Sequence, residues 1–239
     1  MNPDIASALA EMDKINVSRL EHPGPLALEP ASCRFLAAFI RATGARKVLE
    51  FGSGFSSLMI ARELGEQEGS YLLSIDNSPQ YSRLAKDSVE SSESRAKTEF
   101  RVAPLRPKFY GMRLLLSYSL PKGLLEALGP FDLVLIDPPH HQYGRESVFY
   151  DAFPALAPGG YVILDDANRE EAEKKYLSSW DAAYGDAINP VVLEGIGKGL
   201  AVIEKLEDVP RWPLPAGESV LATLETLRNA GRLLFGRKE

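Results

Sequence analysis

The 239-residue chain lacks the features on which several classes of protein depend. Its one cysteine, Cys33, excludes a disulfide framework within the chain, which is typical of a reducing compartment. Cys33 lies in the apolar stretch Ala31–Ile40, so we expect a buried side chain and not a nucleophile. No apolar run is long enough to span a bilayer, and Met1–Ala10 contains Asp4 and no basic group, which excludes a typical signal peptide. We therefore expect a cytoplasmic protein of bacterial type that does not enter a membrane.

The chain also lacks an excess of positive charge. Its formal net charge is −6 and its pI is about 5.3, so it has no general attraction for phosphate backbones. Nucleic acid is thus an unlikely partner, and a small molecule is expected instead. With 45% hydrophobic and 25% charged residues and no internal repeat, the composition is that of one ordinary globular domain.

Short aliphatic runs alternate with longer amphipathic stretches, which is typical of βαβ units and a mainly parallel sheet. The expected strands are Lys47–Phe51, Ser70–Ile75, Glu99–Ala103, Phe131–Ile136, Tyr161–Asp165, Pro190–Leu193 and Leu200–Glu204. The expected helices are Ala31–Thr43, Ser56–Leu64, Pro79–Ser91, Gly123–Leu128, Val148–Leu156 and Glu170–Tyr184. The run Ala157–Gly160 is expected to stop the fifth of these helices.

The last two strands are separated only by Glu194–Gly199, which is too short for a parallel crossover, so they should form an antiparallel hairpin. The main domain is expected to cover residues 31–206. Residues 1–30 form an N-terminal cap segment. Residues 207–239 hold a proline-rich linker and an amphipathic helix, Glu218–Leu234, either of which can contact a second copy in a homodimer.

A glycine turn follows the first strand, which reads Val48-Leu49-Glu50-Phe51-Gly52-Ser53-Gly54-Phe55-Ser56-Ser57. The glycines allow a sharp turn and close approach of a ligand to the main chain, and the helix that follows offers free N–H groups to an anion. The third glycine of a dinucleotide-binding turn is replaced by Ser57, which disfavours that version of the motif. An acid, Asp76, ends the second strand, where it can accept ribose hydroxyls or begin the next helix with Asn77 and Ser78.

Together these residues resemble the cofactor motifs of class I S-adenosylmethionine-dependent methyltransferases. The resemblance implies an α/β, doubly wound, Rossmann-like sheet of seven mostly parallel strands in the order 3-2-1-4-5-7-6. It also implies that the cofactor S-adenosyl-L-methionine contacts a set of nine residues: Glu50, Gly52, Ser53, Gly54, Ser56, Ser57, Asp76, Asn77 and Asp137. In that set Ser56 and Ser57 bind the cofactor carboxylate. Many members carry an adenine-binding acid after the third strand, whereas this chain has Ala103-Pro104, so the adenine contacts should be apolar or from backbone.

Polar residues also gather after the fourth and fifth strands, in Asp137-Pro138-Pro139-His140-His141 and in Asp165-Asp166. Ligands of an open α/β sheet bind beyond the carboxyl ends of its strands, so these side chains should converge at the reaction site. The stretch resembles small-molecule O-methyltransferases of the catechol and macrolide-sugar types, some of which bind Mg²⁺ there. By this resemblance Asp137, Asp165 and Asp166 form a metal triad, although catechol-type enzymes have asparagine at the position of Asp166.

Two mechanisms and two further functions stay open at this stage. The acceptor hydroxyl is held either by Mg²⁺ or next to a base, and the candidate catalytic residues are Asp137, His140 and His141. Asp137-Pro138-Pro139-His140 also resembles the signature of nucleic-acid amino-methyltransferases, whose fourth residue is aromatic. A non-catalytic protein that binds the cofactor or a nucleotide is the other alternative.

The segment from Arg106 to Gly123 is expected to be a long loop between the third and fourth strands. It contains Arg106, Lys108, Tyr110, Arg113 and Tyr118. These side chains are either substrate contacts or a solvated face over Leu114-Leu115-Leu116, and the sequence favours neither interpretation.

Overall fold

The computed structural model describes residues 2–17, 28–65, 67–92, 94–138, 145–169 and 173–209, together with positions 224, 227, 228 and 231. The main sheet consists of β1 (Lys47–Phe51), β2 (Tyr71–Asp76), β3 (Lys97–Val102), β6 (Phe131–Ile136), β7 (Leu156–Asp165), β8 (Ile188–Leu193) and β9 (Leu200–Lys205). Most of the predicted helix Glu218–Leu234 lies outside the described residues. None of the helices described is long and apolar enough to cross a membrane.

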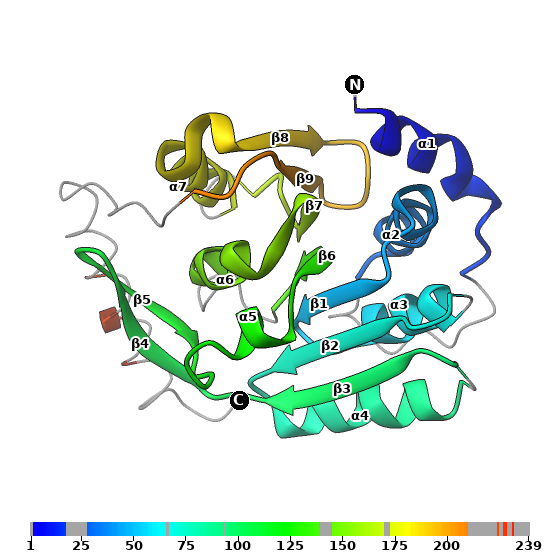
Figure 1. The fold of residues 1–239 in the computed structure, drawn as a ribbon, viewed down its shortest axis with the longest axis horizontal. Helices are drawn as coiled ribbons and strands as arrows, with labels where there is room; N and C mark the ends of the chain where they lie inside the picture. Colours follow the sequence, from blue (N-terminus) through cyan, green and yellow to red (C-terminus); the bar gives the residue numbers. More distant parts are fainter. Residues whose placement is uncertain are drawn as a thin grey trace.

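The sheet has the order β3-β2-β1-β6-β7-β9-β8, which confirms the predicted seven-stranded topology (Figure 1). Within this sheet the neighbouring strands β3, β2, β1, β6 and β7 are parallel, and β9 pairs antiparallel with both β7 and β8. The sheet reverses its winding direction between β1 and β6, so the carboxyl ends of these two strands form the crevice where such folds bind ligands.

Helices cover both faces of the sheet. They are α1 (Pro3–Glu11), α2 (Pro30–Thr43), α3 (Phe55–Gly65), α4 (Pro79–Glu90), α5 (Leu124–Leu128), α6 (Arg145–Ala152) and α7 (Glu173–Tyr184). Single 3₁₀ turns follow α1, α6 and α7 at Met12–Lys14, Phe153–Ala155 and Gly185–Ala187. One buried cluster joins the sheet to the α1–α4 side, and a second joins it to α5, α6 and α7.

Local sequence explains where two of these helices begin and end. Pro79 opens α4, and the Ser78 side chain accepts a hydrogen bond from the Tyr81 N–H, so Ser78 and not Asp76 caps this helix. Pro30 opens α2, and Gly44 ends it in the left-handed conformation with φ of +64°.

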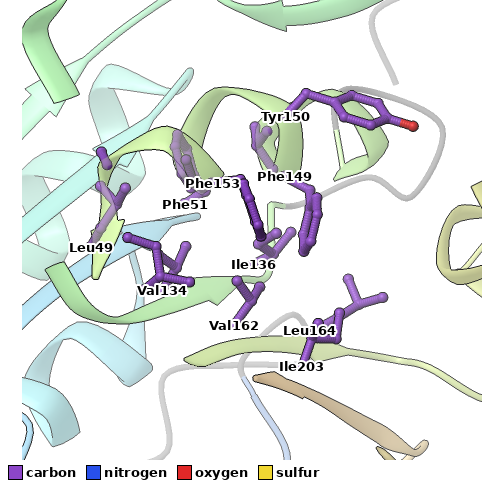
Figure 2. Packing of buried hydrophobic residues seen from close by; sticks show 14 of the residues in the cluster. Leu49, Phe51, Val134, Ile136, Phe149, Tyr150, Phe153, Val162, Leu164 and Ile203 are labelled. Atoms are coloured by element: carbon purple, nitrogen blue, oxygen red, sulfur yellow. The ribbon is translucent and has the colours of Figure 1, made fainter. Parts of the chain in front are cut away.

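Aromatic side chains form much of the second cluster, which joins the sheet to α5, α6 and α7. Phe149 of α6 stacks on Trp180 of α7, with ring centroids 4.2 Å apart, and Tyr184 contacts Phe153 at the same distance. In Figure 2 Phe149 and Phe153 lie over Ile136 of the sheet. All eight residues of α6 are buried, including Arg145, Glu146 and Asp151. The helix therefore has no solvent face, and its sequence shows no amphipathic period.

The segment after β3 is not the long loop expected from the sequence. It forms an antiparallel hairpin of β4 (Leu105–Tyr110) and β5 (Arg113–Tyr118), which lies apart from the main sheet in Figure 1. Gly111, with φ of +59°, supplies the left-handed turn residue between the two strands. Asp151 of α6 anchors the hairpin by accepting hydrogen bonds from Lys108, Tyr110 and Ser117.

The expected helix end at Ala157–Gly160 is also wrong. The helix ends at Ala152, and β7 already begins at Leu156, so the proline and both glycines lie within the strand. Glycine is needed at position 160 because a Cβ there would lie 2.9 Å from the backbone oxygens of Ala157 and Asp132, which is too close. The glycines mark close backbone packing at an irregular strand start and not a helix stop.

Candidate active site

The glycine turn after β1 packs directly against the end of β6. Gly52 has a φ of +99°, and a Cβ at this position would lie 2.0 Å from the Asp137 carbonyl oxygen. Only glycine fits such a contact. By contrast, an added Cβ at Gly54 would meet nothing within 4 Å, so the main chain there is open to an approaching ligand. The two glycines thus have different roles, one in packing and one facing open space.

Glu50 lies fully buried beneath this turn. Its Oε1 accepts a hydrogen bond from Ser56, and its Oε2 accepts bonds from Ser57 and Ser74, at 2.5–2.6 Å. Burial raises the pKa of Glu50 to about 7, although the three hydroxyl groups oppose that rise. The Ser56 and Ser57 hydroxyls, which were expected to bind a cofactor carboxylate, are instead engaged with Glu50.

Asp76, at the end of β2, holds the backbone of the glycine turn after β1 and of the turn that follows β2. Its Oδ2 accepts a hydrogen bond from the Ser53 N–H at 2.8 Å, and its Oδ1 accepts one from the Ser78 N–H at 2.6 Å. Burial raises its pKa, and backbone hydrogen bonds from Ser78, Ser53 and Asn77 oppose the rise. Each carboxylate oxygen can accept a second hydrogen bond, so Asp76 keeps the capacity to bind hydroxyl groups.

The predicted acidic cluster forms at the ends of β6 and β7. One carboxylate oxygen from each of Asp137, Asp165 and Asp166 lies within 4.8 Å of the other two. Asp166 has a φ of +62°, which is uncommon outside glycine but is tolerated by aspartate better than by most residues. This backbone conformation follows directly on β7 and brings two consecutive carboxylates to the same cluster.

A buried cation, Arg145, stands in the middle of these acids. Its guanidinium donates to Asp137 Oδ1 at 3.0 Å, to Asp166 Oδ2 at 3.1 Å and to Glu173 Oε1 at 3.0 Å. It also donates to the carbonyl oxygens of Pro138 and Asp165. A planar group with five donors can satisfy so many acceptors at once, and lysine cannot.

The charges of this cluster do not balance. Within the described residues, four carboxylates, those of the triad and Glu173, are ion-paired with two guanidinium groups, because Arg169 also pairs with Asp166 at 3.0 Å. Burial, with the Asp165 charge next, raises the pKa of Asp137 well above its usual range. Burial and the charge of Asp166 raise the pKa of Asp165 to about 6. The cluster therefore favours a proton or a further cation.

The sequence did not reveal Arg145 or Glu173 as members of this cluster. No spacing rule connects either residue to Asp137, and Arg145 precedes the helix start expected at Val148. Both predicted catalytic histidines, His140 and His141, lie outside the described residues. The other predicted site residues meet at the same edge of the sheet, from the Gly52 turn to Asp166.

Comparison with known proteins agrees with this arrangement. The profile of a family described as a methyltransferase domain matches residues 49–167, which run from β1 through the glycine turn to the end of the acidic cluster. The chain therefore contains a methyltransferase domain. Residues of the glycine turn, Asp76 and the triad all lie inside the matched range of this methyltransferase.

Individual relatives are distant. A catechol O-methyltransferase from Niastella koreensis is 23% identical over 150 residues, which span 61% of this methyltransferase and 60% of the relative. The solved O-methyltransferase from Bacillus cereus, in complex with SAH, has a TM-score of 0.58 at 16% identity and covers 86% of this chain and 91% of its own. TomG from Streptomyces achromogenes, an O-methyltransferase of tomaymycin synthesis in complex with SAM, also has a TM-score of 0.58, at 17% identity and with coverage of 87% and 91%.

The two glycines of the turn should respond differently to alanine. Gly52→Ala is expected to lose on the order of 3 kcal/mol or more of stability, because its methyl group would collide with the Asp137 carbonyl. Gly54→Ala should change stability by less than about 1 kcal/mol and instead weaken cofactor binding at least about tenfold. Denaturant unfolding and calorimetry measure the two effects. Equal stability losses in the two variants would contradict the assignment.

Glu50 should make stability depend on pH. Its pKa is about 7 in the folded protein, whereas the ordinary value of a glutamate is 4.5, so the folded state holds the extra proton between these values. The contribution of Glu50 to stability is therefore complete below pH 4.5 and declines as the pH rises through 7, by about 3 kcal/mol in all. Glu50→Gln does not titrate, so its stability relative to the native chain should improve by up to that amount between pH 5 and pH 8. Thermal unfolding across this range measures the gap, and a constant gap would disprove the buried titration.

Proposed function

We propose that this protein transfers a methyl group from S-adenosyl-L-methionine to a hydroxyl oxygen of a small molecule. The observation that carries the proposal is the backbone contact between Gly52 and Asp137. Because of it, the turn that would hold the methyl donor and the acids that would receive the acceptor share one boundary. Methyl transfer to oxygen is an in-line displacement, so adjacency of donor and acceptor is the main requirement. The three relatives described above are each named as O-methyltransferases, which supports an oxygen acceptor over a nucleic-acid amine.

In this proposal Asp76 accepts the ribose hydroxyls, and the open main chain at Gly54 lies along the methionine portion. Ser53 and Asn77, whose backbone N–H groups bond to Asp76, hold that carboxylate in place. Glu50 orders the turn from below through its bonds to Ser56 and Ser57. It supports the cofactor site from a fully buried position.

The acidic triad suits a divalent cation of the magnesium type. Its three carboxylate oxygens are the ligands that Mg²⁺ prefers, and the four acids exceed the two guanidinium groups by two negative charges. Asp137, Asp165 and Asp166 would hold the ion, which would bind the acceptor hydroxyl and lower its pKa. Arg145 bonds to one carboxylate oxygen of Asp137 and to one of Asp166, which holds these two acids close together. The catalytic roles predicted for Asp137, His140 and His141 stay predictions.

Cofactor binding tests the first half of the proposal. Asp76→Asn should weaken binding of S-adenosyl-L-methionine by about ten- to a hundredfold in calorimetry, since one acceptor oxygen becomes a donor. Asp132→Asn is the matched control. Asp132 also accepts two backbone N–H groups, from Arg46 and Lys47, but at the amino end of β1. The control should lose stability and keep its affinity. No binding by folded native protein would refute the methyltransferase activity.

Metal binding tests the second half. The native protein should bind Mn²⁺, a paramagnetic substitute for Mg²⁺, and Asp165→Asn should weaken this binding at least about tenfold. Asp165 suits the test because, in the described part of the structure, Arg145 donates to its carbonyl oxygen and not to its side chain. Asp181→Asn changes the same charge at an exposed site and should bind as the native protein does. If methylation is unchanged in EDTA and the native protein does not bind Mn²⁺, the proposed metal site is wrong. The proposed O-methylation would still stand.

A further inference from the structure

The Tyr118 side chain is buried without a hydrogen-bond partner. The residue is 2% exposed, and within the described part of the chain no donor or acceptor lies within hydrogen-bonding distance of its hydroxyl. Leaving such a group unpaired destabilises a folded protein, because the hydroxyl has lost its hydrogen bonds to water. Buried polar groups without partners are rare in native proteins, and one beside an active site calls for a ligand that pairs with it.

Tyr118 reaches the crevice from the hairpin and not from the main sheet. It is the last residue of β5 and pairs in register with Leu105, while the next residue, Ser119, donates its N–H to the Pro104 carbonyl. Its ring lies 5.4 Å from that of Phe51, the last residue of β1. The side chain therefore stands beside the ends of both β1 and β3.

The charges around the hydroxyl come from the proposed active site. Burial raises the pKa of Tyr118 well above its usual range, and the charge of Asp76 is the next contribution. Asp137 and Glu50 raise it further, whereas Arg145 lowers it. These groups belong to the ends of β2, β6 and β1 and to the start of α6. Among these charged groups, Asp76, the acid assigned to the ribose, has the largest effect on the hydroxyl.

The two residues that directly follow β3, Ala103 and Pro104, offer no polar side chain at this corner. A backbone hydrogen bond from the Ser119 N–H to the Pro104 carbonyl holds the end of the hairpin at this corner. A phenol can both donate and accept a hydrogen bond, so it can pair with ring nitrogens or with ribose oxygens.

We propose that the Tyr118 hydroxyl hydrogen-bonds the adenosine portion of the cofactor and completes the cofactor site from the β4–β5 hairpin. The inference rests on the proposed methyltransferase function. It assigns to the hairpin a direct part in cofactor recognition, with Phe51 as the apolar support of the phenol ring. Tyr118 is a binding residue in this assignment and takes no part in the transfer of the methyl group.

Tyr118→Phe tests the assignment, with Tyr110→Phe as the matched control. Tyr110 is a buried tyrosine of the same hairpin, but its hydroxyl donates to Asp151 at 2.6 Å. Tyr118→Phe should raise the Kd of S-adenosylhomocysteine and of methylthioadenosine, which lacks the amino-acid portion, by about five- to tenfold. The KM for the cofactor should rise, and kcat at saturating cofactor should stay unchanged.

Stability without ligand gives the second readout. Tyr118→Phe removes an unpaired hydroxyl, so its unfolding midpoint should stay the same or rise, whereas Tyr110→Phe should lower the midpoint and keep the native Kd. Native affinity in Tyr118→Phe, or a lowered midpoint without a change in Kd, would overturn the role of Tyr118 and leave the proposed function standing. Failure of the native protein to bind either nucleoside would overturn both.

Discussion

The buried guanidinium of Arg145 is the interaction on which the geometry of the site depends. It bonds to side chains of β6, of the turn after β7 and of α7, and to two backbone carbonyls between them. Carboxylates this close repel one another and are costly to bury. Arg145, together with Arg169 at Asp166, makes their convergence possible, yet among the described residues the acids still outnumber the guanidinium groups. A site built in this way is both held together and still able to attract a cation.

The cofactor side of the crevice depends on a different kind of constraint, which is steric. Gly52 can lie against the Asp137 carbonyl only because it has no Cβ, and Glu50 below it is fixed by three serine hydroxyls. The turn and the acidic cluster are therefore parts of one packed unit. A change in the position of Asp137 would therefore displace both the glycine turn, where the methyl donor is proposed to bind, and the acidic cluster, where the acceptor is proposed to bind.

The sequence was informative where local chemistry and topology coincide. Alternating strands and helices predicted the parallel sheet, the short connection before β9 predicted the terminal hairpin, and the resemblance to methyltransferases supplied the strand order and the metal triad. The rule that parallel strands end at one edge predicted that the acids converge. It was misleading where tertiary contacts decide. Gly159 and Gly160 are typical of a helix stop but lie in β7, and the charges of β4 and β5 suggested a loop although their partners are buried acids of α6. Arg145 carries no local pattern because its partners are distant in the chain.

Helix α6 connects these features physically. Its first residue, Arg145, bonds to the acids of the cluster. Glu146 and Asp151 form ion pairs with Arg113 and Lys108 of the hairpin. Phe149 packs on Trp180 of α7. A helix so contacted cannot shift to accommodate one neighbour without disturbing the others, since well-packed interiors transmit displacement. The hairpin and the acidic cluster are consequently positioned by the same eight residues. The β4–β5 hairpin is thus an integral part of the crevice, because α6 both anchors the hairpin and carries Arg145.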